Sequence, residues 1–347
     1  MGAGTNIDVL IGGNEVSDAD VMGFTVDRDM FQPDMAAVIL SNQNDIFGGK
    51  FKIGQEIEIK AGSPGVSIYK GEIVGFEGFW KGGQTTKLLV RAMNKMHRLL
   101  RKRKSVTYTD KTDEAILKQV VGDAGLVLKW EHKTSITYKH VYQHNQTDLE
   151  FLRTRAARMG CHVWCVGTDI FVKEPNLGDS SGKELNVDKA NELKGFTPRI
   201  NSASVVKKVT VKGWNPETKE LITGDASAEK SALGAEGAVD ACGELGKEET
   251  FTVDHPIWSA EEAKAIAKAR LRDLNLQFIT GEAECEGIYD VELGKSISIS
   301  ANSDGSDPFN GNYYVMGMTH RFAMPKGPDK GGLTTTFRLA RDGQKKG

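Results

Sequence analysis

The sequence lacks the features of a membrane-spanning or secreted protein. Its 347 residues contain no run of about 18 apolar residues, the length that a transmembrane helix needs. The N-terminus has no basic stretch followed by an apolar one, so no secretory signal is visible. We therefore expect a chain that is made in the cytoplasm and has no stable membrane insertion.

Cysteine and proline are both scarce. The four cysteines, Cys161, Cys165, Cys242 and Cys285, do not show the paired spacing of a zinc site, and Cys161 and Cys165 fall on one face of an apolar strand. We predict that they pack in the core of a protein made in a reducing compartment. Nine prolines against 39 glycines indicate many tight turns and bulges between strands.

The common sequence signatures of enzymes are missing. There is no Gly-x-x-x-x-Gly-Lys-Ser/Thr loop and no Gly-x-Ser-x-Gly elbow. A Ser, His and Asp triad needs no local pattern, and nothing marks one. The net charge of −2 argues against a phosphate-binding surface spread over the whole molecule. We assign no catalytic, cofactor-binding or metal-ligating residue, and no cofactor.

Two segments about two hundred and forty residues apart resemble each other. Each begins with a Gly-led alternating strand, continues into a strand interrupted by glycine, and passes through a Lys-Gly-Gly-x-Thr-Thr turn into a last strand. The segments are Ile53–Ala61, Gly71, Gly75 and Lys81–Arg91 in the first half, and Leu293–Ala301, Gly311, Gly317 and Lys330–Leu339 in the second. The shared order predicts an internal duplication of a β module.

The fold class that we predict is α+β and mostly β. Short alternating strands with glycine turns favour a first small β-barrel over residues 1–104. An inserted α+β domain is expected over 105–195, and a second, similar barrel over 196–347. Within the second barrel we expect a packed helix at about 259–276 and a mobile loop at about 224–249, which is rich in Gly, Ala and Glu.

Local signals place the main elements of the middle and last thirds. Thr147 with Glu150, and Ser259 with Glu262, each have the spacing of a capping box at the start of a helix. Helical spacing of apolar residues predicts another helix over Asp113–Val121. Two apolar runs predict a hairpin of Cys161–Val166 and Asp169–Lys173.

His140 and His144 are the best-spaced metal pair in the sequence. Histidines four apart can chelate on a helix, but Tyr138, His140, Tyr142 and His144 alternate with other residues at the period of a strand. Four strand residues span roughly 13 Å, too far for one zinc ion. We therefore predict no metal at this pair.

Glu282, Glu284 and Glu286 lie on one face of a predicted strand. Three interpretations stay open: a solvated face, the negative lining of a channel that keeps anionic cargo from sticking, or a catalytic carboxylate pair roughly 7 Å apart. Catalysis would also require one carboxyl group to be buried with a raised pKa.

A basic stretch, Arg98–Lys104, follows the first predicted barrel. It could contact an anionic partner, or it could be a solvated connector. No aromatic residues are interleaved with its charges, which weakens the idea of single-strand nucleic-acid binding.

Three segments carry a resemblance to a known family. Val209–Lys219 and Gly311–Phe322, with the Thr-Thr strand that follows, resemble signatures of phage late control protein D, the tail-hub family. Tyr142–Leu152 is similar to the segment that type VI secretion spike proteins share with these hubs. The resemblance extends over roughly Phe24 to Arg341.

This resemblance implies a non-enzymatic baseplate hub of a contractile phage tail or tail-like particle. Such hubs are homotrimers whose two similar barrels per subunit form a pseudo-sixfold ring. The ring joins the hexameric inner tail tube protein to a trimeric spike, contacts other baseplate proteins, and gives transient passage to DNA or protein cargo. The implied location is the virion or tail-like particle, assembled in the bacterial cytoplasm.

The resemblance also bears on what this chain does not carry. Related spike proteins continue into a further barrel, a β-helical needle or a lysozyme domain, whereas this sequence stops at Gly347 directly after its last predicted strand. We therefore expect a separate spike protein. Two other functions remain as alternatives: a carbohydrate- or receptor-binding module of a tail tip, and a tail-associated cell-wall hydrolase.

Overall fold

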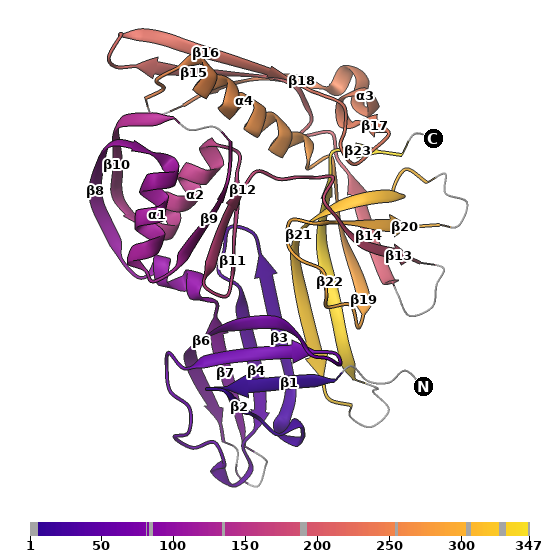
Figure 1. Ribbon diagram of the computed structural model, residues 1–347. Helices are drawn as coiled ribbons and strands as arrows, with labels where there is room; N and C mark the ends of the chain where they lie inside the picture. The colour runs from indigo at the N-terminus through magenta and orange to yellow at the C-terminus, as the bar shows by residue number, and fades with distance from the viewer. Residues whose placement is uncertain are drawn as a thin grey trace.

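The protein is mostly β, with strands from both halves of the chain joined in one large sheet (Figure 1). The structure is a computed structural model that describes residues 6–80, 82, 86–133, 136–187, 193–253, 256–302, 307–325 and 331–345. Within these residues the sheet has 13 strands, and its main path runs in the order β14-β19-β22-β21-β3-β4-β7-β6-β5-β1-β2.

The first module contributes the N-terminal strands of this sheet. Their alternating apolar residues face one core, which includes Val9, Val38 and Ile59. The elements of the first module are β1 (Ile7–Ile11), β2 (Asn14–Glu15), β3 (Val21–Asp29), β4 (Met35–Ser41), β5 (Glu56–Ala61), β6 (Val66–Phe79) and β7 (Lys87–Met93), with the 3-10 turns η1 (Asp18–Asp20), η2 (Gln43–Asp45) and η3 (Lys95–Leu100).

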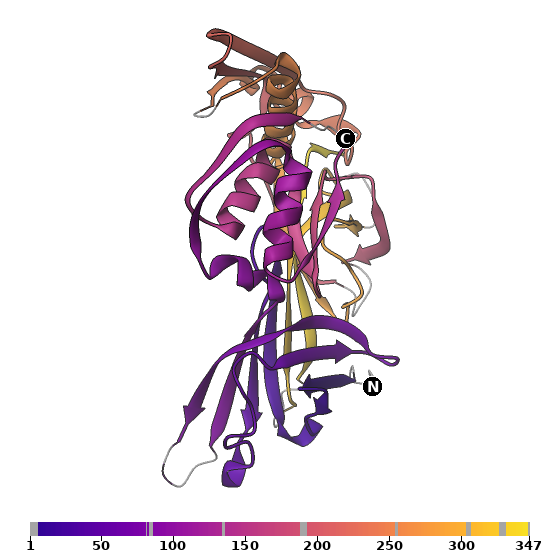
Figure 2. The ribbon, with the colours of Figure 1, turned by 60° about the vertical axis from the view of Figure 1, so that its left-hand side comes forward.

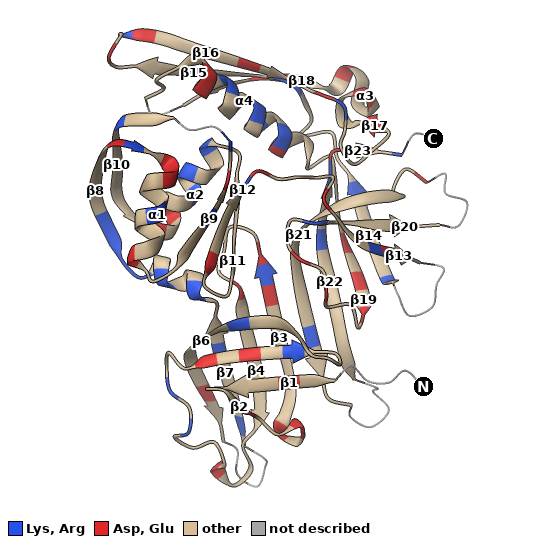
Figure 3. Cartoon of the chain, viewed as in Figure 1, with Lys and Arg blue, Asp and Glu red and all other residues tan. Residues whose placement is uncertain are grey.

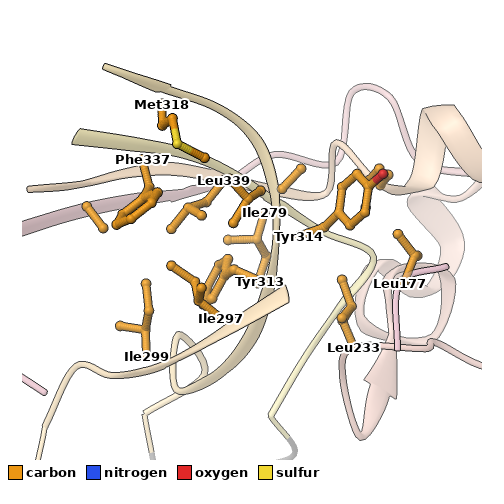
Figure 4. Close-up of a cluster of buried hydrophobic side chains, with 14 of the residues drawn as sticks. Leu177, Leu233, Ile279, Ile297, Ile299, Tyr313, Tyr314, Met318, Phe337 and Leu339 are labelled. Atoms are coloured by element: carbon orange, nitrogen blue, oxygen red, sulfur yellow. The ribbon is translucent and has the colours of Figure 1, made fainter. Parts of the chain in front are cut away.

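The second module contributes the remaining strands of the sheet. It buries its own core, in which Tyr313, Phe337 and Leu339 are central (Figure 4). Its elements are β13 (Ser180–Asn186), β14 (Leu193–Ile200), β19 (Ile279–Glu286), β20 (Ser296–Ser300), β21 (Gly311–Ala323) and β22 (Gly332–Arg341). β13 lies in the range 105–195, which the sequence analysis assigned to the α+β domain. It pairs with β20 of the second module and so belongs to the large sheet.

The prediction of two β-barrels is wrong in one respect. Within the described residues, neither module closes into a barrel. The reason is that β3 of the first module pairs with β21 of the second. In a closed barrel, β3 would pair with another strand of its own module instead. The strands of both modules are parts of one open sheet instead.

The α+β domain lies beside this sheet and has a separate core (Figures 1 and 2). Its elements are β8 (Arg103–Thr112), α1 (Asp113–Asp123), β9 (Val127–Glu131), β10 (Thr137–Thr147), α2 (Asp148–Arg158), β11 (His162–Val166) and β12 (Asp169–Lys173). The predicted hairpin and both predicted helices are confirmed. So is the capping box: Thr147 Oγ1 accepts from the Glu150 N–H at 3.1 Å, and Glu150 accepts from the Thr147 N–H at 2.8 Å.

A further layer is inserted between β14 and β19. Helix α4 (Ala260–Asn275) packs on a three-stranded sheet of β15 (Val206–Asn215), β16 (Glu220–Ser227) and β18 (Lys247–Thr252), which lies within the range 196–347 but is separate from the large sheet. Ser259 caps α4 as predicted. However, Glu262 accepts from the Trp258 N–H at 2.9 Å and not from the Ser259 N–H, so the reciprocal half of the box is shifted by one residue.

The segment 224–249, which was predicted to be a mobile loop, contains regular elements. They are the end of β16, β17 (Glu236–Gly237), α3 (Ala238–Cys242), η4 (Gly243–Leu245) and the start of β18, and β17 pairs with β23 (Gly343–Gln344). The Asp342 carboxylate holds this segment by accepting from Ser231 Oγ at 2.6 Å and from the Ala232 N–H at 2.9 Å. A contact with a residue so distant in sequence leaves no local signal.

Candidate functional site

The seam between the two modules is formed by β3 and β21. The strands are antiparallel, with Asp29 opposite Gly317 and Gly23 opposite Ala323. Phe24 stacks on Phe322 with ring centroids 5.4 Å apart. On the other face of the sheet, Thr319 Oγ1 donates to Asp27 Oδ1 at 2.9 Å. The seam therefore combines backbone pairing, an aromatic contact and a polar contact.

The strands on either side of this seam have the same order. In the first module the path is β5-β6-β7-β4-β3, and in the second it is β20-β21-β22-β19-β14. All of these neighbouring pairs are antiparallel, and the five strands follow the same order along the chain in both modules. Each of these five strands of one module thus has a counterpart in the other.

The counterparts agree in individual hydrogen bonds. The Gly54 N–H donates to the Ile73 carbonyl at 2.8 Å, and the Gly294 N–H donates to the Val315 carbonyl at 3.2 Å. In return the Ile73 N–H reaches the Gln55 carbonyl, and the Val315 N–H reaches the Lys295 carbonyl, both at 2.9 Å. Both glycines have positive φ, +85° and +81°, which favours glycine at this turn.

The long strand of each module also has a bulge at the same place. The register shifts between Ile73 and Gly75 in β6, and between Val315 and Gly317 in β21. After the bulge Gly75 lies opposite Arg91, and Gly317 lies opposite Arg338. This pairing makes Arg338 the counterpart of Arg91.

The structural register corrects part of the repeat found in the sequence. Aligning the two Lys-Gly-Gly-x-Thr-Thr turns would match Arg91 with Ala340, two residues away from the structural counterpart Arg338. Gly71 and Gly311 are likewise not counterparts. Gly71 faces Ile57, three residues after Gly54, whereas Gly311 faces Ile299, five residues after Gly294. Lys81 and residues 83–85 of the first turn and Lys330 of the second lie outside the described residues.

One further repeat was missed at the sequence level. β3 and β14 both contain Gly-Phe-Thr, as Gly23-Phe24-Thr25 and Gly195-Phe196-Thr197. Both strands carry a bulge immediately before that triplet, at Val21/Gly23 and at Leu193/Gly195. A repeat of three residues is too short to be recognised in a chain of this length. The bulge at the same place in both strands shows that Gly23-Phe24-Thr25 corresponds to Gly195-Phe196-Thr197.

The sequence matches the model of the family described as Alg8 N-terminal domain over residues 5–323. The chain belongs to the Alg8 N-terminal domain family. That description names a domain and no activity. No protein in the curated collection matches the sequence.

Solved structures show what fold this family member has. A tail protein from Neisseria meningitidis MC58 is similar with a TM-score of 0.73 at 14% identity, over 98% of this chain and 97% of that one. The 43 kDa tail protein of prophage MuSo2 from Shewanella oneidensis is similar with a TM-score of 0.74 at 13% identity, over 97% and 98%. The E. coli c3393 protein, a component of the type VI secretion system, is similar with a TM-score of 0.64 at 13% identity, over 96% and 76%. The expected resemblance to tail proteins and type VI secretion proteins is therefore confirmed at the level of the fold.

The signature segments of that resemblance hold the fold together. Asn215 Oδ1 accepts from the N–H groups of Glu217 and Thr218 at 2.9 and 3.2 Å, which closes the turn after β15. Gln143 is buried and donates to Asp148 Oδ1 at 3.1 Å, which fixes the junction of β10 with α2. Both segments are explained by packing and turn geometry.

The Glu282, Glu284 and Glu286 side chains are exposed on β19, while Ala283 and Cys285 are buried, as the alternation predicted. Arginines accompany them on the same face, because directly opposite residues of paired strands share a face. Glu282 lies opposite Arg338 on β22, and acidic and basic positions adjoin on these strands (Figure 3). This face is thus polar and of mixed charge, which weakens the interpretation of these glutamates as the negative lining of a channel.

The remaining sequence candidates do not converge on a chemical centre. His140 and His144 lie on strand β10, as the alternation predicted, and both side chains are exposed. Among the described residues, no three His, Cys, Asp or Glu side chains gather as metal ligands. In the same described part of the chain, no helix is long and apolar enough to cross a membrane.

The basic stretch Arg98–Lys104 is largely paired within the molecule. Arg98 Nε donates to Glu72 Oε2 at 3.1 Å, Arg103 contacts Glu150 at 2.9 Å, and Lys104 contacts Asp148 at 2.7 Å. These ion pairs fasten η3 and β8 to β6 and α2, so the stretch is a connector with internal partners.

Two histidines are buried without charge at contacts between elements. His320 on β21 is fully buried, and Thr335 Oγ1 lies 2.8 Å from its Nδ1. His162 on β11 lies 3.0 Å from the Tyr314 hydroxyl, which joins the α+β domain to the second module. Burial lowers the pKa of each histidine to about 3, so both rings are neutral at physiological pH.

Proposed function

We propose that this protein is a structural subunit of a phage tail or tail-like contractile particle, and specifically its baseplate hub. The observation that carries the proposal is the doubled strand order within one chain, with counterpart hydrogen bonds and bulges in the two modules. The fold shared with tail proteins and with a type VI secretion component supports the same role.

The hub is proposed to be a homotrimer. Three chains with two similar modules each present six similar faces, so a threefold ring can match a hexameric inner tube on one side. The other side keeps threefold symmetry and suits a trimeric spike. We take the doubled module to be an internal duplication that serves this change of symmetry.

The proposed mechanism is mechanical and requires no catalytic residue. The ring couples tube to spike, contacts other baseplate proteins and leaves an axial opening for DNA or protein cargo. The polar face of β19 and β22 is a candidate lining for that opening, because the opposite face of the same strands is buried in the core. Its mixed charge would give cargo of either sign little to bind. The proposed location is the baseplate of a particle assembled in the bacterial cytoplasm.

Native mass spectrometry of the purified chain, alone and with the inner tube protein of the same particle, tests this proposal. We expect a trimer, and in the mixture a complex of one trimer with a multiple of six tube subunits. A chain that stays monomeric or dimeric in both samples over the micromolar range, with no bound tube protein, would contradict the hub.

A further inference from the structure

Two of the strand edges that lack a partner strand in the described part of the chain are those of β14 and of the second half of β6. β14 pairs with β19 on one side only. β6 pairs with β7 along its second half, but β5 covers its other side only from Val66 to Glu72, which leaves that side open from Gly75 to Phe79. In Figure 1 β14 lies on the right of the large sheet and β6 on the left of the lower module.

These two open edges are the counterparts of the two strands that form the seam. β14 corresponds to β3, through the shared Gly-Phe-Thr and the bulge before it. The second half of β6 corresponds to the second half of β21, through the bulge at Gly75 and Gly317. Each chain therefore contains one completed seam and the two separate halves of a second one.

We propose that the open half of β6 pairs with β14 of a neighbouring copy, antiparallel and in the register of the β3–β21 seam. The inference rests on the proposed ring and adds the joint that would build it. The expected register follows when each residue of the β3–β21 seam is replaced by its counterpart. The facing pairs are then Glu77 with Arg199, Gly78 with Pro198, Phe79 with Thr197 and Trp80 with Phe196.

The aromatic contact of the seam is repeated in this joint. Phe24 and Phe322 stack within the chain, and their counterparts Phe196 and Trp80 are also aromatic. Trp80 is 70% exposed, a costly position for the largest apolar side chain in an isolated subunit. Phe79 and Ile200 of the same two edges are 52% and 42% exposed. Pairing would place these exposed side chains against a second surface.

The polar contact of the seam is repeated as a charge pair. Thr319 and Asp27 are joined by a hydrogen bond, and their counterparts are Glu77 and Arg199. The Glu77 and Arg199 side chains are both exposed, and Glu77 contacts Arg91 of the neighbouring strand β7 at 2.5 Å. The joint would place Glu77 between two arginines, which favours this register over one that brings like charges together.

Gly195 gives an independent indication of a missing strand. At its counterpart Gly23, a Cβ atom would lie 2.7 Å from the Phe322 carbonyl oxygen, so the close approach of β21 requires glycine there. A Cβ atom at Gly195 meets nothing within 4 Å. A neighbouring β6 in the seam register would bring its own backbone to this position and explain the glycine.

The joint also accounts for how a ring could close without leaving the edges of β6 and β14 open. Each copy pairs through β6 with one neighbour and through β14 with the other, so the interface is heterologous. The ring closes at three copies if each joint repeats the rotation between the two modules at the seam. The eight strands from β14 to β6 of each chain would then form one continuous closed sheet. Pro198 lacks an N–H group, which makes β14 a poor template for indiscriminate pairing.

Disulfide formation between engineered cysteines tests the joint. In a Cys242→Ser background, whose three other cysteines are buried, Glu77→Cys with Arg199→Cys should cross-link neighbouring chains under mild oxidation. On non-reducing gels we expect bands of two and three chains. Asp27→Cys with Thr319→Cys is the matched control, because the same counterpart positions face each other within one chain and should give an internal disulfide only.

A slipped pair makes the test specific for register. Glu77→Cys with Pro198→Cys should not cross-link, because a slip of one residue points the side chains to opposite faces. If the chain is a trimer by native mass and the internal control closes but E77C with R199C stays uncoupled, the joint is wrong and the hub proposal stands. If the chain is neither trimeric nor able to bind the tube protein, both are wrong.

Discussion

Phe24 and Phe322 stack at 5.4 Å although one lies near the start of the chain and the other near its end. Phe24 belongs to the buried core of the first module, and Phe322 packs against that core from β21. Leu333 of β22 is also buried in it. The N-terminal module therefore depends on residues from the C-terminal one, and the two cannot be treated as independent domains.

Gly23 and Gly195 should respond differently to the same substitution. Gly23→Ala places a methyl group against the Phe322 carbonyl and should lower the stability of the unassembled chain by roughly 1–3 kcal/mol. Gly195→Ala has room and should change it by no more than about 0.5 kcal/mol. Urea unfolding of both variants below the concentration of assembly checks this. Equal losses would show that the close approach at Gly23 has no energetic weight.

Acidification should destabilise the protein through His320 and His162. The folded-state pKa of each is lowered to about 3, below the 6.5 of the unfolded chain, so the unfolded state takes up the proton first. The stabilisation is complete above pH 6.5 and is lost as the pH falls toward 3. Between pH 7.5 and 5 this amounts to about 2 kcal/mol per histidine.

The comparison of His320→Asn with the parent protein isolates this effect. Asn can keep a polar contact with Thr335 but does not titrate. The loss of unfolding free energy between pH 7.5 and 5 should therefore be about 2 kcal/mol smaller in the variant. Asp34 acts in the opposite direction, because burial raises its pKa to about 6, and it does so equally in both proteins. Identical pH profiles would refute the role of His320.

The buried ion pair of Asp113 and Arg155 should be sensitive to the loss of one partner. Arg155 Nε lies 2.5 Å from Asp113 Oδ1, and its guanidinium lies 4.5 Å from the centroid of the Tyr138 ring. Asp113→Ala leaves an unpaired buried charge and should cost roughly 3–5 kcal/mol. Thermal unfolding measures this loss, with the exposed Arg153→Met as control. The double variant Asp113→Leu with Arg155→Met should recover most of it.

Asp342 should control the order of the segment around Ser231. Its carboxylate accepts from Ser231 Oγ and from the N–H groups of Ala232 and Leu233, the last at 3.2 Å. Asp342→Ala should speed amide hydrogen exchange at residues 232–234 and cost about 1–3 kcal/mol, because these donors lose their acceptor. Exchange in the α+β domain is the internal reference and should not change. Unchanged exchange at 232–234 would contradict this role.

Features that depend on neighbouring residues could be predicted from the sequence. The Thr147 capping box, the hairpin of β11 and β12 and the alternation of β19 are set within about ten residues, and the structure confirms all three. The correspondence of Gly54 with Gly294 was also visible, because both need a positive φ before an alternating strand.

Features that depend on distant partners could not be predicted. Nothing in the local pattern of β3 says that β21 will pair with it, so the modules were predicted to close separately. The sequence placed α4 only within the range 196–347, since its apolar face fits any apolar sheet and only the three-dimensional structure selects β15 and β16. The Lys-Gly-Gly turns misled the alignment by two residues, because turn composition repeats more easily than strand register.

The seam has a consequence for how the chain is made. Because β3 needs β21, the N-terminal strands leave the ribosome almost three hundred residues before their partner does, and they cannot be completed until translation is nearly over. During that interval an unpaired β3 on one nascent chain could accept β21 from another chain on the same polysome. Prematurely terminated products would therefore be prone to entanglement, and a low local concentration of full-length chains would favour correct intramolecular closure.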